Sequence, residues 1–203
     1  MDKKKLTERD ICTKFITPAL VAAGWDLHHQ IREEVTFTAG RVQLRGQLVS
    51  RGKSKRADYI LYYKPNLPIA VIEAKDNHHS LSSGMQQALD YAHTLDIPFV
   101  YASNGDGFVE HDRTRKAGIL EQELPLAGFP SPQDLWERYK QWKGLTDDQA
   151  RIITQDYYFD AGGKAPRYYQ RIAINRVIEA VAQNQNRILL VSATGTGKTY
   201  IAF

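Results

Sequence analysis

The sequence predicts an α/β protein: a mixed central sheet flanked by helices, followed by a helical linker and the beginning of a further domain. Three observations support this prediction. The 203 residues exceed one typical domain of about 150 residues but do not reach two. Apolar residues recur first at helical spacing and then in strand-like runs. Segments rich in proline and glycine then break the pattern. We therefore expect domains at 1–125 and 166–203, joined by a helical linker at 126–165.

The first helix is expected over residues 7–23, where apolar residues recur at helical spacing. Thr7 and Asp10 form a weak capping box at its start. Pro18 interrupts the pattern, because proline removes a backbone donor. We expect either a kink at this point or a new helical start that is capped by Thr17.

A β-rich stretch and a second helix complete the first domain. Its continuous apolar runs are typical of strands that are covered on both faces, and its helix carries an apolar stripe on one side. The strands are expected at 33–37, 42–49, 57–63, 69–72, 98–102 and 108–111, the last of them ending near residue 115, and the helix at 80–95.

Three further elements are expected after this domain. Ser131 followed by Pro132 is a common helix start, and Gly144 is a common helix end. A second helix is expected at 168–183. A buried strand is expected at 187–193, because this segment is a nearly unbroken apolar run.

Composition excludes several classes of protein. Hydrophobic residues make up 42% and charged residues 25%, which is ordinary for a globular chain and excludes general disorder. No run approaches the ~18 apolar residues of a membrane helix, and the N-terminus is not a signal peptide. The single cysteine, Cys12, excludes an internal disulfide. A reducing, cytoplasmic location is the simplest interpretation.

The net charge is only +4, but basic residues cluster in one stretch. Six of them occur between Arg41 and Arg56, with no acidic residue among them. Such a run can contact a polyanion, or it can be the solvated charge of an exposed hairpin. Taken alone, the run favours the hairpin.

The segment Thr194-Gly195-Thr196-Gly197-Lys198-Thr199 follows the apolar run and is typical of a phosphate-binding loop. Its glycines let the backbone curl so that N–H groups face phosphate oxygens. Lys198 would then reach the β- and γ-phosphates, and the Thr199 hydroxyl would hold Mg²⁺. The start of the following helix also favours an anion. The motif therefore predicts ATP with Mg²⁺ as the ligand of residues 194–199.

Upstream, Pro166-Arg167-Tyr168-Tyr169-Gln170 resembles the adenine-reading segment of superfamily 2 helicases. The resemblance implies that Gln170 hydrogen-bonds the adenine edge of ATP. The 203 residues carry neither the second acidic motif nor the arginine finger that such motors use for hydrolysis. We therefore expect a P-loop motor domain that is truncated in this chain and inactive as an ATPase.

The first domain contains a second set of reactive side chains. Asp58 lies near the start of one strand-like run, and Glu73 and Lys75 end the next. Residues two apart in a strand share a face, so Glu73 and Lys75 project to one side. Asp58 joins them if the two runs pair. Two carboxylates could then hold Mg²⁺ for phosphodiester hydrolysis. Lys75 would orient or deprotonate the attacking water or stabilise the transition state. The alternative is a Glu–Lys surface pair.

The pattern Asp58…Glu73-x-Lys75 resembles the PD-(D/E)xK nuclease core, with Ala57 in the place of the family's proline. This resemblance implies a restriction-endonuclease-like fold. It also implies catalytic roles for these three residues, with Asp58 and Glu73 as the metal ligands.

Downstream, the segment 87–91 matches the Q-x-x-x-Y signature of the RecB-like branch of these nucleases. Gln87 and Tyr91 are one helical turn apart and share a helix face. The resemblance implies that both line the catalytic site or contact DNA. This branch often carries an additional acidic residue, for which Glu8, Glu33 and Glu34 compete.

A RecB-like nuclease, a linker and a superfamily 2 motor form the layout of the restriction (R) subunit of type I restriction-modification enzymes. The segments KFITPALVAAGW (Lys14–Trp25) and IEAK resemble the same subunits. The resemblance implies ATP-driven translocation, cleavage of unmodified double-stranded DNA, and assembly with methylation and specificity subunits. Two alternatives are a non-catalytic DNA-binding or docking module and a stand-alone nuclease of another repair or defence system.

Overall fold

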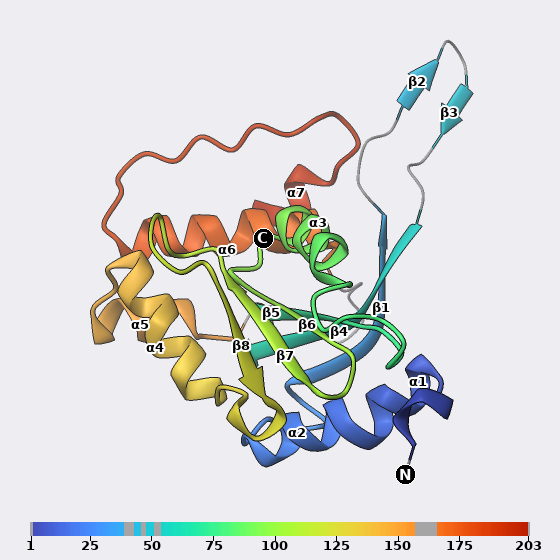
Figure 1. Ribbon diagram of the computed structural model, residues 1–203. Helices are drawn as coiled ribbons and strands as arrows, with labels where there is room; N and C mark the ends of the chain where they lie inside the picture. Colours follow the sequence, from blue (N-terminus) through green and yellow to red (C-terminus); the bar gives the residue numbers. More distant parts are fainter. Residues whose placement is uncertain (1, 39–42, 46–47, 51–53, 157–165, 203) are drawn as a thin grey trace.

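The computed structural model describes residues 2–38, 43–45, 48–50, 54–156 and 166–202 (Figure 1). Its centre is a mixed six-stranded sheet with the strand order β1-β4-β5-β6-β7-β8. Strands β5 and β6 pair in parallel and the other neighbours pair antiparallel. The strands are β1 (Ile31–Thr38), β4 (Ser54–Lys64), β5 (Leu67–Ala74), β6 (Phe99–Ser103), β7 (Gly107–Asp112) and β8 (Glu121–Pro125).

Helices cover both faces of the sheet (Figure 1). On one face, residues of the N-terminal helices and of α4 (Pro132–Lys143) pack against Tyr59 and Tyr101. On the other face, α3 (Met85–Leu95) packs against Ile60 and Val71. The run Ile69–Ile72 is fully buried between the two layers, which is the burial expected of a continuous apolar strand. The predicted mixed sheet flanked by helices is thus confirmed.

The N-terminal helix forms as expected but contains a wider turn. α1 (Glu8–Ile11) leads into a π-helical segment (Cys12–Ile16) and then into α2 (Thr17–Ala22). The predicted capping box of Thr7 and Asp10 is present. A new helical start occurs before Pro18, but no side chain caps it, so the expected Thr17 cap is wrong. The π-helical turn instead accommodates Pro18, which has no backbone N–H to donate to the helix.

The segment expected to form one strand at 42–49 instead forms two short strands. β2 (Gln43–Arg45) and β3 (Leu48–Ser50) pair antiparallel with each other, outside the main sheet. Figure 1 shows this pair extending away from the body of the protein. Most side chains of the basic run from Arg41 to Arg56 lie outside the described residues, so its expected role stays a prediction.

The sheet extends further along the chain than expected, because β8 follows residue 115. Its sequence is Glu-Gln-Glu-Leu-Pro, and most of these residues are exposed. β8 is an edge strand that pairs only with β7. A polar edge strand has low intrinsic strand propensity and forms because its neighbour supplies the hydrogen bonds.

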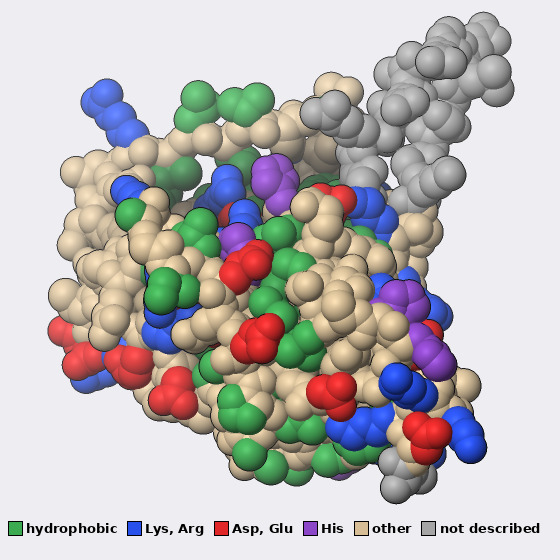
Figure 2. Space-filling model, in the orientation of Figure 1, with side chains coloured by type: hydrophobic (Ala, Val, Ile, Leu, Met, Phe, Trp, Pro, Cys, Tyr) green, Lys and Arg blue, Asp and Glu red, His purple; other side chains and the backbone are tan. Residues whose placement is uncertain are grey.

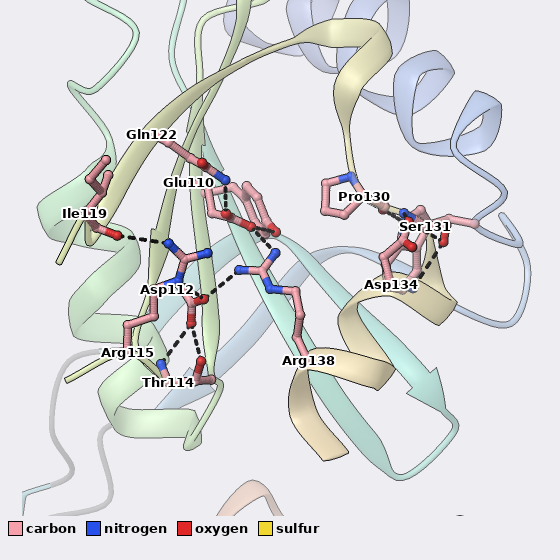
Figure 3. Close-up of polar contacts among 12 residues, drawn as sticks. Glu110, Asp112, Thr114, Arg115, Ile119, Gln122, Pro130, Ser131, Asp134 and Arg138 are labelled. Atoms are coloured by element: carbon pink, nitrogen blue, oxygen red, sulfur yellow. Dashed lines mark hydrogen bonds and ion pairs between the residues drawn. The ribbon is translucent and has the colours of Figure 1, made fainter. Parts of the chain in front are cut away.

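Helix α4 begins after the Ser131 cap and ends at Gly144, as predicted. A short helix, α5 (Asp147–Ile153), follows it. Arg138 of α4 contacts Glu110 and Asp112 of β7, in each case at 2.7 Å (Figure 3). Both carboxylates are buried, so the guanidinium ties the helix to the sheet.

The C-terminal region contains α6 (Tyr168–Ala182) and α7 (Lys198–Ala202). The helix predicted at 168–183 is therefore confirmed. The buried strand predicted at 187–193 is wrong: these residues form no strand, and Leu189 and Val191 are 89% and 82% exposed. A central strand needs neighbours on both sides and cover on both faces, and none of the described strands lies beside this segment.

The surface is mixed in charge. On the face shown in Figure 2, acidic and basic side chains are interspersed, which agrees with the small net charge. Among the described residues, no helix combines the length and the apolar character that are needed to cross a membrane.

Candidate active site

The pairing of β4 with β5 brings the sequence-predicted acids together. Tyr59 pairs with Ile72 in this antiparallel ladder, so Asp58 and Glu73 occupy the next position. Residues opposite each other in an antiparallel pair project to the same face. The ladder ends here, and Oδ2 of Asp58 accepts a hydrogen bond of 2.8 Å from the backbone N–H of Ala74. Asp58 is therefore oriented by the strand that carries Glu73.

The Glu73 carboxylate is buried and only half satisfied. The residue is 2% exposed. Its Oε1 accepts a 3.0 Å hydrogen bond from Nζ of Lys75, whereas its buried Oε2 has no hydrogen-bond partner among the described residues. Burial, followed by the charge of Asp58, raises the pKa of Glu73 to about 7. A buried acceptor without a donor is costly and therefore points to a missing ligand.

Lys75 is the positive group of the site. Its Nζ lies 3.0 Å from Oε1 of Glu73 and 3.8 Å from Oε2 of Glu8. Burial lowers the pKa of Lys75, but its hydrogen bond and ion pair with Glu73 outweigh this effect and raise the pKa overall. Lys75 is therefore held as an ammonium ion.

Of the three competing acids, the structure brings Glu8 to the site. Its carboxylate faces Lys75, and its pKa is raised by burial and by Asp58 against the opposing charge of Lys75. Glu33 and Glu34 form ion pairs with Arg9 at 3.6 and 3.0 Å, and they line a small cavity together with Glu8 and Asp58.

Gln87 and Tyr91 share one face of α3, as expected, and a hydrogen bond joins their side chains. Nε2 of Gln87 donates to the Tyr91 hydroxyl at 2.7 Å. Burial raises the pKa of Tyr91, and the negative charges of Glu73 and Asp58 add to this effect. The helix face therefore lies within the electrostatic range of the acidic pair.

Gly84 is a residue of the site that the sequence did not single out. It precedes α3 and lies directly against Glu73: a Cβ at this position would be 2.9 Å from Cγ of Glu73. A glycine before a helix is a weak signal, so this contact could not have been found from spacing. Because Gly84 has no side chain, the buried Glu73 carboxylate fits against the start of α3.

The donor set suits a hard divalent cation. Among the described residues, no group of three or more acidic, histidine or cysteine side chains could hold a metal. Mg²⁺ does not need such a group, because it is commonly held by one or two carboxylates together with waters and substrate phosphates. Asp58 and Glu73 fit this description, and the free Oε2 of Glu73 supplies a ligand atom.

The predicted phosphate loop is a second candidate site. Gly195 and Gly197 both have positive φ, at 78° and 77°, a conformation that suits glycine. α7 begins at Lys198, so the following Thr199 is also in its first turn. Nζ of Lys198 donates to the backbone carbonyl oxygens of Ser192 and Ala193 at 3.2 and 3.1 Å.

Gln170, on α6, contacts this loop directly. Its Nε2 donates to the carbonyl oxygen of Thr196 at 3.1 Å, and its Oε1 accepts from the backbone N–H of Arg167. Gln170 is 7% exposed. The residue predicted to read adenine and the predicted phosphate loop are thus adjacent, although 26 positions separate Gln170 from Thr196.

Comparisons with known proteins relate this chain to subunits of restriction enzymes. A family model described as "Type I restriction enzyme R protein N terminus (HSDR_N)" matches residues 26–123. A second, described as "Type III restriction enzyme, res subunit", matches residues 163–203. The type I restriction enzyme EcoAI endonuclease subunit of Escherichia coli is 54% identical over 100% of this chain. The EcoKI endonuclease subunit of Escherichia coli (strain K12) is 25% identical over 74% of it.

A solved structure is also similar. A fragment of an HsdR subunit of a type I restriction enzyme from Vibrio vulnificus YJ016 has a TM-score of 0.82 and 43% identity over 98% of this chain. The chain spans 37% of that structure, 25% of the EcoAI subunit and 16% of the EcoKI subunit. The chain therefore belongs to the family of type I restriction enzyme R (HsdR) subunits, and it corresponds to their N-terminal region.

Proposed function

We propose that this chain forms the Mg²⁺-dependent DNA endonuclease module of an ATP-dependent type I restriction enzyme, which hydrolyses phosphodiester bonds of unmodified double-stranded DNA. One observation carries the proposal. The buried Glu73 carboxylate, beside Asp58, accepts a hydrogen bond from Lys75 at one oxygen, whereas its other oxygen has no hydrogen-bond partner among the described residues. A cation ligand explains why a half-satisfied carboxylate is kept in the interior.

Asp58 and Glu73 would hold the Mg²⁺. When bound, this ion would lower the pKa of an attacking water and offset the negative charge of the scissile phosphate. The hydrogen bond from Ala74 fixes Asp58, so the fold sets its direction before a ligand arrives. The raised pKa of Glu73 means that cation binding would be coupled to loss of a proton at this residue.

Lys75 acts as a cation in this proposal. Because its contacts with Glu73 and Glu8 favour the ammonium form, it is better suited to orienting the water or stabilising the pentacovalent transition state than to removing a proton. Glu8 supplies the additional acidic group and keeps the Lys75 side chain directed toward the site. Gln87 and Tyr91 would contact the DNA next to the acids.

The phosphate loop and Gln170 would bind ATP with Mg²⁺, with Lys198 exchanging its carbonyl contacts for phosphate oxygens. We expect no ATP hydrolysis by the 203-residue chain itself, since a second acidic motif and an arginine finger would have to come from elsewhere in a motor. Methylation and specificity subunits are the proposed protein partners, and the cytoplasm the proposed location.

Titration calorimetry of the 203-residue chain with Mn²⁺ and Mg²⁺ tests the site. Wild type is expected to bind one ion, and Asp58→Asn to lose this binding. Asp148→Asn is the matched control, because Asp148 is exposed and pairs only with Arg151 in the described structure. Equal binding by wild type and Asp58→Asn would show that the site is misassigned, and would favour the non-catalytic docking module.

A further inference from the structure

The ring of Phe37, near the end of β1, lies between two functional segments that are far apart in sequence. It meets Tyr91 of α3 edge-on, with ring centroids 5.3 Å apart. It also meets Tyr168, the first residue of α6, at 6.3 Å and again edge-on. Phe37 and Tyr91 are only 6% and 7% exposed. Attraction between aromatic rings depends on their relative orientation, so the three rings constrain one another.

One end of this row of rings reaches the candidate nuclease site. The hydroxyl of Tyr91 accepts the hydrogen bond from Gln87, and the charges of Glu73 and Asp58 act on its phenol. The Tyr91 ring and the Gln87 side chain are therefore held together at this end of the row.

The other end reaches the phosphate loop. Tyr168 stands two residues before Gln170, whose side chain holds the carbonyl oxygen of Thr196. A cavity of about 1180 Å³ separates β1 from the loop, and both Phe37 and Tyr168 line it together with residues 194–196. Movement of the loop toward a bound nucleotide would therefore act on the start of α6.

The start of α6 cannot move independently of the first domain, because three polar contacts attach this helix to it. Arg171 donates to the Tyr62 hydroxyl at 3.1 Å, and Arg176 lies 2.9 Å from Asp96. Asn175 donates to the carbonyl oxygen of Asn66 at 3.0 Å. A shift at Tyr168 would therefore be passed to the first domain through packed atoms, which is one physical route for energetic coupling between two sites.

We propose that Phe37 is a positioning residue shared by the two sites: it holds Tyr91 for DNA cleavage and Tyr168 for nucleotide binding, and so couples them. The proposal rests on the proposed function, since it assumes cleavage at Asp58 and ATP at residues 194–199. Because the Phe37 ring contacts both Tyr91 and Tyr168, its loss should weaken nucleotide binding as well as cleavage.

The test uses Phe37→Leu in a full-length R subunit that carries this sequence, assembled on unmodified target DNA. The KM for ATP is expected to rise about five-fold with little change in kcat, and cleavage at saturating ATP is expected to fall about five-fold. Phe37→Tyr, which keeps the ring, should restore both values. Phe15→Leu is the matched control, because Phe15 is a partly buried phenylalanine that packs with the other core cluster.

Unchanged KM and cleavage in Phe37→Leu, or a change in only one of them, would overturn the proposal. If Phe37→Leu does not fold, cleavage at saturating ATP by Tyr168→Leu, at the partly exposed end of the row, tests the coupling instead. Asp58→Ala in the same assay separates the two hypotheses. Continued cleavage by Asp58→Ala would refute the proposed nuclease site, whereas the ATP readout of Phe37→Leu would still report on the contact with Tyr168.

Discussion

The backbone N–H of Ala74 donates a 2.8 Å hydrogen bond to Oδ2 of Asp58, where the pairing of β4 with β5 ends. The bond joins two neighbouring strands through a side chain, and it engages one of the two carboxylate oxygens. It therefore fixes the aspartate next to Glu73 and Lys75. The acidic pair is organised by the fold itself, which is the condition that a preformed metal site has to meet.

Glu73 should make the metal-free protein less stable as the pH rises. Its pKa is raised by burial from 4.5 to about 7, so the folded state favours the neutral carboxyl. The neutral Glu73 carboxyl therefore contributes its full stabilisation of the folded state below pH 4.5. This contribution is lost as the pH rises through 7 and Glu73 ionises in the folded protein. The loss is on the order of 3 kcal/mol. Glu73→Gln should lack this decline. Urea unfolding at pH 5 and pH 8 measures it, with exposed Glu123→Gln as the control.

The same pH dependence in wild type and Glu73→Gln would contradict the burial of an ionisable Glu73. Addition of Mg²⁺ at pH 8 should restore part of the lost stability in wild type, because a ligand that binds the folded state stabilises it. It should have no such effect on Glu73→Gln.

Gly84→Ala should disturb the site without removing any reactive group. The new methyl would lie 2.9 Å from Cγ of Glu73, closer than real contacts allow, so the carboxylate must shift. Overpacking of this kind costs about 1–3 kcal/mol in stability. Cleavage by the full-length subunit should fall about ten-fold or more, because catalytic geometry tolerates little displacement. Ser83→Ala, one residue away and exposed, should cleave normally. Normal cleavage by Gly84→Ala would show that Glu73 is not held against this helix start.

Arg138→Ala should cost about 3–5 kcal/mol, since it leaves two buried carboxylates without their shared cation. Arg138 contacts Glu110 and Asp112 at 2.7 Å (Figure 3), and the two acids are 1% and 3% exposed. Denaturant unfolding gives the change. Arg151→Ala removes an exposed pair with Asp148 and should change stability by less than about 0.5 kcal/mol. Similar small losses in both variants would mean that α4 is held by apolar packing alone.

Local signals in the sequence predicted much of the fold. The capping box at Thr7, the Ser131 start and the apolar run at Ile69–Ile72 each depend on neighbouring residues, and each was confirmed. The strand expected at 187–193 failed for the opposite reason: apolar composition favours burial, but a strand forms only where other strands supply hydrogen bonds. β8 was missed because its polar sequence forms a strand only through pairing with β7.

Part of the candidate site was also within reach of the sequence. Strand alternation alone places Glu73 and Lys75 on one side, and one helical turn separates Gln87 from Tyr91. The contact of Lys75 with Glu8 could not be predicted, because it joins segments that are distant in sequence and have no spacing rule. The same holds for Arg138 with Glu110. Such pairs become visible only when the sheet and its covering helices are placed in space.

DNA cleavage by Asp58→Ala and Lys75→Ala in a full-length R subunit tests the central claim most directly. Each variant should remain folded and hydrolyse ATP at the wild-type rate, since neither residue touches the phosphate loop, but should lose cleavage of unmodified DNA in Mg²⁺. Cleavage at the wild-type rate by both variants would contradict the claim that these residues form a nuclease site.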